Sequence, residues 1–356
     1  DYGDITLAAG GAILGVTLGS LISVIYLHVK YRGAGSALAD AAGTPKSGRA
    51  TMKELLSIAV PITLGSAGLQ IINLFDTMIY MRRLELGLGW SVEMAENLKG
   101  VYNYQQTIFA LPCAFIPTIT IACIPAITAA LTRRELDNVR ATEESAIRTM
   151  ALVAMPCAAG LFAMAEPVIR LLCTSYTPEQ LAVATKMLMI LGVAVIFNSL
   201  VLLFNAFMQA HGDVTSPVIN MFIGGIVKIA VNYVLVGIPE INIVGAPVGT
   251  LVCYVVITVL NYFALRRCVK GDLPIFRNLI RPLIASAIMG AGTFMVYRVL
   301  RTLLPSGRLA CLAALLFAVC LYLILAVALR CITYEDCMLL PKGEKIAKIL
   351  RIREKN

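Results

Sequence analysis

Polar side chains recur at helical spacing inside stretches of this sequence that are otherwise apolar. Lys228 is the most informative of them, because Asn220, Gly224 and Asn232 lie at four-residue steps around it and therefore share one face of a helix. A lysine in the hydrocarbon region of a membrane costs about 2.5–3.5 kcal/mol unless it faces a cavity or a partner. We interpret Lys228 as a cation in a polar cavity. The alternative is that Lys228 balances a buried carboxylate such as Asp76.

Other apolar stretches carry polar residues of the same kind. Each such set has a structural alternative, which is hydrogen bonding between packed helices. For Asp76, which precedes Arg82 and Arg83 closely in sequence, a local ion pair at the membrane surface is the rival interpretation. The candidate substrate-binding residues are Lys228, Asn232, Asn220, Asn205, Gln209, Asn198, Asp76, Arg82, Arg83, Gln105 and Gln106.

The sequence gives no sign of enzymatic chemistry. Its two histidines, His28 and His211, each lie at the end of an apolar stretch, so no histidine-based metal cluster or catalytic triad can assemble within these stretches. Most of the ten cysteines lie inside apolar stretches without CxxC spacing and are interpreted as small packing residues. We therefore expect a protein that is not an enzyme, with no catalytic residue, metal site or cofactor.

The apolar stretches that carry these residues are long enough to cross a membrane. An α-helix rises about 1.5 Å per residue, so about 20 apolar residues cross a hydrocarbon core about 30 Å thick. The composition agrees, with 59% hydrophobic and 14% charged residues. We predict an all-α, polytopic membrane helical bundle with about nine transmembrane helices, near residues 5–29, 55–81, 105–131, 146–165, 181–209, 215–238, 243–265, 279–300 and 309–331.

Lysine and arginine are concentrated in alternate connections between these spans. Because short cytoplasmic loops are enriched in basic residues, this pattern places residues 33–53 and 332–356 inside and residues 82–104 outside. The net charge of +9 then reflects topology and attraction to anionic membrane lipids, so we expect no nucleic-acid partner. The outer connection between the last two spans does not follow this pattern, because three arginines lie in it or next to it: Arg298, Arg301 and Arg308.

Two segments are expected to be irregular. Residues 33–50 are rich in glycine, alanine and serine, which is typical of a linker between two helical bundles. The span at 105–131 contains Pro112, Pro117 and Pro125, and an interior proline removes a backbone hydrogen bond and bends a helix. A gating helix and a kinked packing helix are both compatible with this pattern.

Three segments resemble a known family of transporters. The segments are residues 53–83, residues 100–131 and residues 205–252, and the most specific parts are Asp76-Thr77 followed by Arg82-Arg83, and the run from Gln209 to Asn220. They resemble the polysaccharide-biosynthesis, or stage V sporulation protein B-like, branch of the multidrug/oligosaccharidyl-lipid/polysaccharide exporter superfamily. The resemblance extends over essentially the whole chain.

The resemblance implies an organisation in two lobes with about fourteen transmembrane helices, so about five N-terminal spans would be absent from this sequence. Residues 1–32 would then be the last helix of the N-terminal lobe, and residues 33–53 the cytoplasmic linker between the lobes. Residues 54–332 would form the C-terminal transmembrane lobe, and residues 333–356 a basic cytoplasmic tail.

The resemblance also implies a function. It implies a multi-pass protein of the bacterial cytoplasmic membrane that flips or exports an undecaprenyl-linked oligosaccharide by alternating access, with membrane lipids as further partners. The sequence leaves sodium ions, protons and the membrane potential open as the driving force. The alternatives are a multidrug exporter of the same superfamily and a membrane protein of envelope assembly that transports nothing.

Overall fold

The computed structural model describes residues 2–33, 47–269 and 274–331. These residues are almost entirely helical and contain no β-strand. The predicted all-α membrane bundle is therefore confirmed. Most of the predicted linker at 33–53 and the whole predicted tail at 333–356 lie outside the described residues.

The chain divides into two compact units, residues 1–63 and residues 64–356. The first unit contains helix α1 (Tyr2–Gly33) and the first part of helix α3 (Gly48–Arg82), and the rest of α3 belongs to the second unit. The large apolar side chains of α1 from Leu14 to Val29 are exposed. Such a helix needs an apolar environment in place of water.

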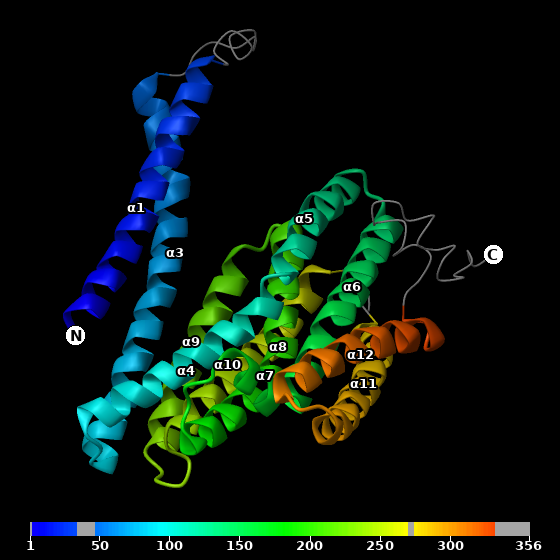
Figure 1. The fold of residues 1–356 in the computed structure, drawn as a ribbon. Helices are drawn as coiled ribbons and strands as arrows, with labels where there is room; N and C mark the ends of the chain where they lie inside the picture. Colours follow the sequence, from blue (N-terminus) through cyan, green and yellow to red (C-terminus); the bar gives the residue numbers. More distant parts are fainter. Residues whose placement is uncertain (1, 34–46, 270–273, 332–356) are drawn as a thin grey trace. The chain divides into compact units, whose positions relative to one another are not determined.

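The second unit is a helical bundle (Figure 1). After α3, its elements are the π-helix η1 (Arg83–Gly87), α4 (Val92–Cys113), α5 (Ile116–Thr132), α6 (Leu136–Ala163), α7 (Ala165–Leu172), α8 (Pro178–Ala210), α9 (Thr215–Val236), the 3₁₀-helix η2 (Asn242–Val244), α10 (Gly245–Cys268), α11 (Ile275–Leu303) and α12 (Gly307–Ala328).

Eight helical segments of the described residues are long and apolar enough to cross a membrane. They are Leu14–Arg32, Val92–Thr132, Leu136–Ala163, Pro178–Ala210, Thr215–Val236, Asn242–Cys268, Ile275–Leu303 and Gly307–Ala328. Each overlaps one predicted span, and α3 covers the remaining predicted span at 55–81.

The third predicted span differs most from the structure. Its sequence forms two helices, α4 and α5, which are separated at residues 114–115 between Pro112 and Pro117. The break follows from the prolines, because a proline ring cannot donate a helical hydrogen bond. Helix α4 also begins at Val92 rather than near residue 105, since the side chain of Ser91 accepts a hydrogen bond from the Met94 amide and caps the helix.

Helix α8 lies at the centre of the second unit. It packs against α4, α5, α6 and α10, and its large side chains, such as Phe204 and Phe207, are fully buried. Around this centre, α9 packs on α10, α6 packs on α11, and α11 packs on α12. Of the eight candidate spans, α8 has the most buried window, 67%, which agrees with its central position.

Candidate functional site

Lys228 of α9 forms a buried ion pair with Asp76 of α3. The Lys228 Nζ lies 3.0 Å from Asp76 Oδ2, and the Asn232 side-chain amide donates a hydrogen bond of 2.6 Å to Asp76 Oδ1. Asp76 and Asn232 are buried, and the Lys228 side chain is 14% exposed. Both carboxylate oxygens of Asp76 are therefore occupied. The pairing of Lys228 with a carboxylate is the alternative that the sequence left open.

Glycines allow the helices around this cluster to approach closely. A Cβ atom at Gly249 of α10 would overlap the side-chain oxygen of Asn232, and one at Gly225 of α9 would lie 2.7 Å from Ile72 of α3. Because contacts of 2.7 Å or less cannot be tolerated without a shift, both positions require glycine in this packing. Neither glycine was identified from the sequence as part of the site.

The two arginines where α3 ends and η1 begins have different surroundings. The Arg83 Nε donates a hydrogen bond of 3.2 Å to the Tyr233 carbonyl, and its guanidinium lies 4.5 Å from the centroid of the Tyr233 ring. A cation near the C-terminal carbonyls of α9 is favoured by the helix dipole, so Arg83 joins α9 to η1. Arg82 is exposed and makes no hydrogen bond or ion pair with another described residue.

Asparagine side chains link α8, α9 and α10. The Asn220 amide donates to Asn261 Oδ1 at 2.9 Å, and the Asn261 amide donates to Asn205 Oδ1 at 2.8 Å. Hydrogen bonding between packed helices, the structural alternative given for the sets of polar residues, is thus present at Asn205 and Asn220. Asn261 was not identified from the sequence, although its position among apolar residues was the available signal.

The remaining candidates are spread along α4 and α8. Asn198 is half-buried beside the Cys113 thiol, and Gln106 is half-buried beside the Tyr102 hydroxyl. Gln105 is fully buried and has no hydrogen bond of normal geometry with a described residue, whereas Gln209 is exposed at the end of α8. The structure therefore brings together Asp76, Lys228 and Asn232, and separately Asn205 and Asn220, but not the whole set.

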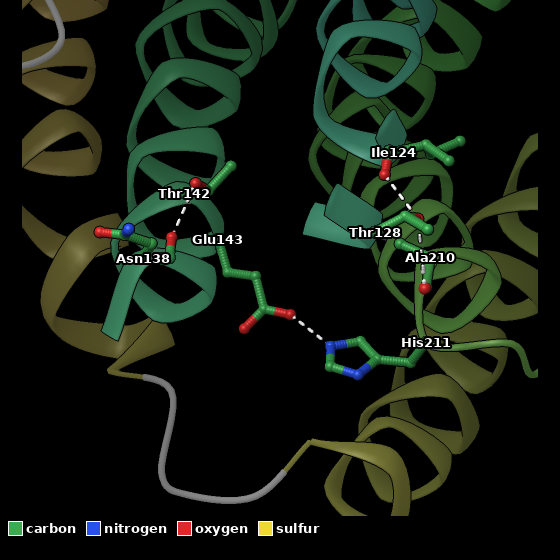
Figure 2. A network of polar contacts seen from close by, with 7 residues as sticks. All are labelled: Ile124, Thr128, Asn138, Thr142, Glu143, Ala210 and His211. Carbon is green, nitrogen blue, oxygen red and sulfur yellow. Dashed lines mark hydrogen bonds and ion pairs between the residues drawn. The ribbon is translucent and has the colours of Figure 1, made fainter. Parts of the chain in front are cut away.

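A second buried polar contact lies at the other end of the bundle. Figure 2 shows Glu143 of α6 pointing toward His211, where a hydrogen bond of 2.8 Å joins Glu143 Oε1 and His211 Nε2. Beside it, the Thr128 hydroxyl of α5 lies 3.4 Å from the Ala210 carbonyl of α8. Glu143 was not identified from the sequence because it lies in a charged segment typical of a solvated helix. This contact fastens the start of α6 to the end of α8.

The buried carboxylates of the bundle show whether an acidic side chain is free to bind a ligand. Asp76 and Glu143 are the fully or nearly fully buried carboxylates among the described residues, and each has a partner. No cluster of three or more histidine, cysteine, aspartate or glutamate side chains that could hold a metal ion occurs in the described part of the chain. These buried polar contacts join helices of the bundle to one another.

Comparison with known families decides the classification. Residues 2–324 match the family described as "Lipid II flippase MurJ". The chain belongs to the MurJ family. Membership makes it a multi-span membrane protein of the bacterial cytoplasmic membrane, in a family of transporters rather than of catalytic enzymes. The resemblance identified from the sequence is thereby confirmed.

Curated relatives agree with this MurJ-family assignment. The chain is 29% identical over 311 residues to the "Uncharacterized membrane protein YabM" of Bacillus subtilis (strain 168), covering 85% of this chain and 56% of the relative. It is 26% identical over 263 residues to "Stage V sporulation protein B" of the same organism, covering 73% of this chain and 49% of that protein. The chain thus spans about half the length of these relatives.

A third relative and a solved structure carry the family name. The "Probable lipid II flippase MurJ" of Rhizobium meliloti (strain 1021) is 25% identical over 249 residues, covering 68% of this chain and 44% of that protein. The structure of "Lipid II flippase MurJ, inward closed conformation" superposes with a TM-score of 0.60 at 13% identity, covering 85% of this chain and 59% of that chain. At this identity the superposition establishes the fold alone.

Proposed function

We propose that this MurJ-family protein flips a lipid-linked oligosaccharide, a precursor of cell wall or polysaccharide, across the cytoplasmic membrane by alternating access. The observation that carries the proposal is the family match over residues 2–324. A probable lipid II flippase among the relatives supports the same class of substrate. The polar groups inside the bundle also suit a transporter that handles a polar head group.

The anionic head group of such a substrate needs cationic partners. A lipid-linked pyrophosphate is recognised best by arginine and lysine side chains in a water-accessible place. Of the three predicted cations, Lys228 is engaged by Asp76 and Arg83 by the Tyr233 carbonyl, whereas Arg82 makes no hydrogen bond or ion pair with a described residue. We therefore propose Arg82 as the first contact for the head group. Lys228 would become a second contact when its ion pair with Asp76 opens.

The charge balance argues against the alternative of a multidrug exporter. A transporter of organic cations needs a carboxylate that is free to bind the cation. Asp76, the carboxylate suited to that role, forms an ion pair with Lys228 and accepts a hydrogen bond from Asn232. While this pair is closed, Asp76 is not available to an organic cation, which disfavours the multidrug alternative.

A flipping assay tests the proposal. The full-length protein is reconstituted in liposomes with a fluorescent lipid-linked saccharide, and head groups that reach the outer leaflet are trapped by a lectin or cleaved by an added enzyme. We expect protein-dependent movement, and imposed sodium and proton gradients in parallel samples identify the driving force. Movement no faster than in protein-free liposomes under every gradient, with a proven flippase active in the same assay, would contradict the proposal.

A point substitution tests the role of Arg82. Arg82→Gln should lower the rate of flipping about tenfold, as the loss of one charge-assisted contact predicts, and leave the yield of folded protein unchanged because the side chain is exposed. Arg298→Gln is the matched control, since it removes the same charge from an arginine that lies over Phe294. Equal rates for both variants and the unaltered protein would remove Arg82 from the substrate path.

A further inference from the structure

A pocket lined by three arginines lies between α7, α11 and α12. Its volume is about 570 Å³, and Arg170, Arg301 and Arg308 all line it, together with Tyr297 and Ser306. In the predicted topology this end of the bundle faces the outside. The pocket therefore contains two of the three arginines, Arg301 and Arg308, that oppose the distribution of positive charge expected for a membrane protein.

The charge of this pocket is only partly balanced by protein groups. Arg170 forms an ion pair of 2.8 Å with Glu166, which does not line the pocket. Arg301 and Arg308 are exposed and make no hydrogen bond or ion pair with any other described residue. No carboxylate of the described residues lines the pocket. Two arginine side chains thus remain available to an anion.

The start of α12 adds to the positive potential. Ser306, Gly307 and Arg308 line the pocket, and the Ser306 side chain makes no capping hydrogen bond to the first turn of this 22-residue helix. The first backbone N–H groups of a helix carry a partial positive charge and favour an anion. The positive charge of Arg308 is unfavourable next to the positive end of the α12 dipole. A bound anion would be attracted to both and would offset this repulsion.

The surroundings of the pocket are apolar. Its wall includes Leu171 and Leu304 in addition to the ring of Tyr297. Next to the lining residues in sequence, Leu303 is 71% exposed and Leu309 is 56% exposed, so α11 and α12 present apolar side chains beside the pocket. In a bilayer such side chains contact acyl chains, whereas a soluble anion would gain nothing from them.

We propose that this pocket binds the phosphate head group of an anionic phospholipid of the outer leaflet. Arg301 and Arg308 hold the phosphate oxygens, the N-terminus of α12 contributes N–H donors, and the acyl chains lie along α11 and α12. Bidentate arginine–phosphate contacts give both charge and orientation. The site is separate from Asp76 and Lys228 and does not depend on the proposed transport function.

Lipid retention by the full-length protein tests this site. The protein is purified in a mild detergent and exchanged against phosphatidylglycerol or zwitterionic phosphatidylcholine, and bound lipid is counted by native mass spectrometry. We expect preferential retention of phosphatidylglycerol. The double substitution Arg301→Gln with Arg308→Gln should weaken it by about tenfold or more, because each basic side chain near the membrane surface contributes on the order of 1 kcal/mol.

Two control variants make the result specific. Arg298→Gln removes one outer arginine that lies over Phe294 and does not line the pocket, so it should retain phosphatidylglycerol. Arg301→Lys with Arg308→Lys keeps the charge and should retain most of the binding. Equal retention by the glutamine variant and the unaltered protein, or an equal loss in Arg298→Gln, would overturn the site. Displacement of the lipid by millimolar inorganic phosphate would overturn the lipid assignment.

Discussion

At the scale of single residues, the buried ion pair makes Lys228 and Asp76 depend on each other. The attraction between two buried opposite charges offsets the cost of removing them from water only while both are present. The Asn232 amide adds a second contact to the carboxylate, so the three side chains fasten α9 to α3 as a unit. Removal of one partner leaves a buried charge without compensation.

A cycle of substitutions measures this coupling. Lys228→Met should lower the free energy of unfolding by about 3–5 kcal/mol, because it strands the Asp76 carboxylate, and Lys228→Met with Asp76→Asn should recover most of that loss. The measurement is thermal unfolding in detergent together with the yield of folded protein. Normal stability of the single variant would contradict the buried pair, and slow flipping by the stable double variant would add a transport role for the pair of Lys228 and Asp76.

The close approach of α9 and α10 at Gly249 leads to a second prediction. Gly249→Ala introduces a methyl group that overlaps the Asn232 side-chain oxygen, so it should lower the free energy of unfolding by about 1–3 kcal/mol. Gly307→Ala is the control, because a Cβ atom there meets no atom within 4 Å. Unfolding temperatures of both variants check the prediction. Equal values would show that α9 and α10 are not in contact at this point.

At the scale of elements, the start of α9 is fixed by the loop that precedes it. Asp213 Oδ1 accepts hydrogen bonds from the amides of Thr215 at 3.2 Å and Ser216 at 3.0 Å. The hydrogen bond from the Ser216 side chain, followed by the Ser216 amide, holds the pKa of the Asp213 carboxyl below its ordinary value. The carboxylate thus satisfies the first amides of the helix that carries Lys228.

The stability of this helix start should depend on pH. Because the pKa of Asp213 is lower in the folded protein, its contribution is present above the ordinary aspartate pKa of about 3.9 and is lost as the pH falls through the lower folded value. At neutral pH, Asp213→Ala should cost about 1 kcal/mol, as for other residues that cap helices, and Asp213→Asn less. Unfolding of the three proteins between neutral pH and about pH 3 measures both effects. A stability difference between the unaltered protein and the Asp213→Ala variant that stays constant over this range would contradict the assignment.

At the scale of the whole molecule, the topology is a prediction that labelling can check. Single cysteines at Glu96, Ala141 and Gly307 would lie in exposed positions of three different predicted connections. In a background without other reactive thiols, an impermeant reagent added outside cells should label the cysteines at 96 and 307 and not the one at 141, because the basic connections lie inside. Labelling of position 141 together with 96 would contradict the span assignment.

The sequence by itself determined the class of this protein. Length and apolarity of each stretch are sufficient for transmembrane helices, because each span must satisfy its backbone hydrogen bonds internally whatever its neighbours are. The predicted spans therefore overlap the observed helices. The resemblance to the stage V sporulation protein B-like branch of the exporter superfamily was carried by the segments around Asp76 and Asn220, and the family match agrees with it. The interruption between α4 and α5 was foreseen as an irregularity, since proline acts locally.

Only the tertiary structure decided which polar groups meet. Spacing along one helix shows that Asn220 and Lys228 share a face, but it does not show that Asn261 of α10 and Asp76 of α3 lie opposite them. The same holds for Glu143 and His211, and for Arg301 and Arg308, which come together beside Arg170 from separate helices. The physical reason is that pairing depends on helix rotation and close approach, which are set by packing at positions such as Gly249 rather than by local sequence pattern.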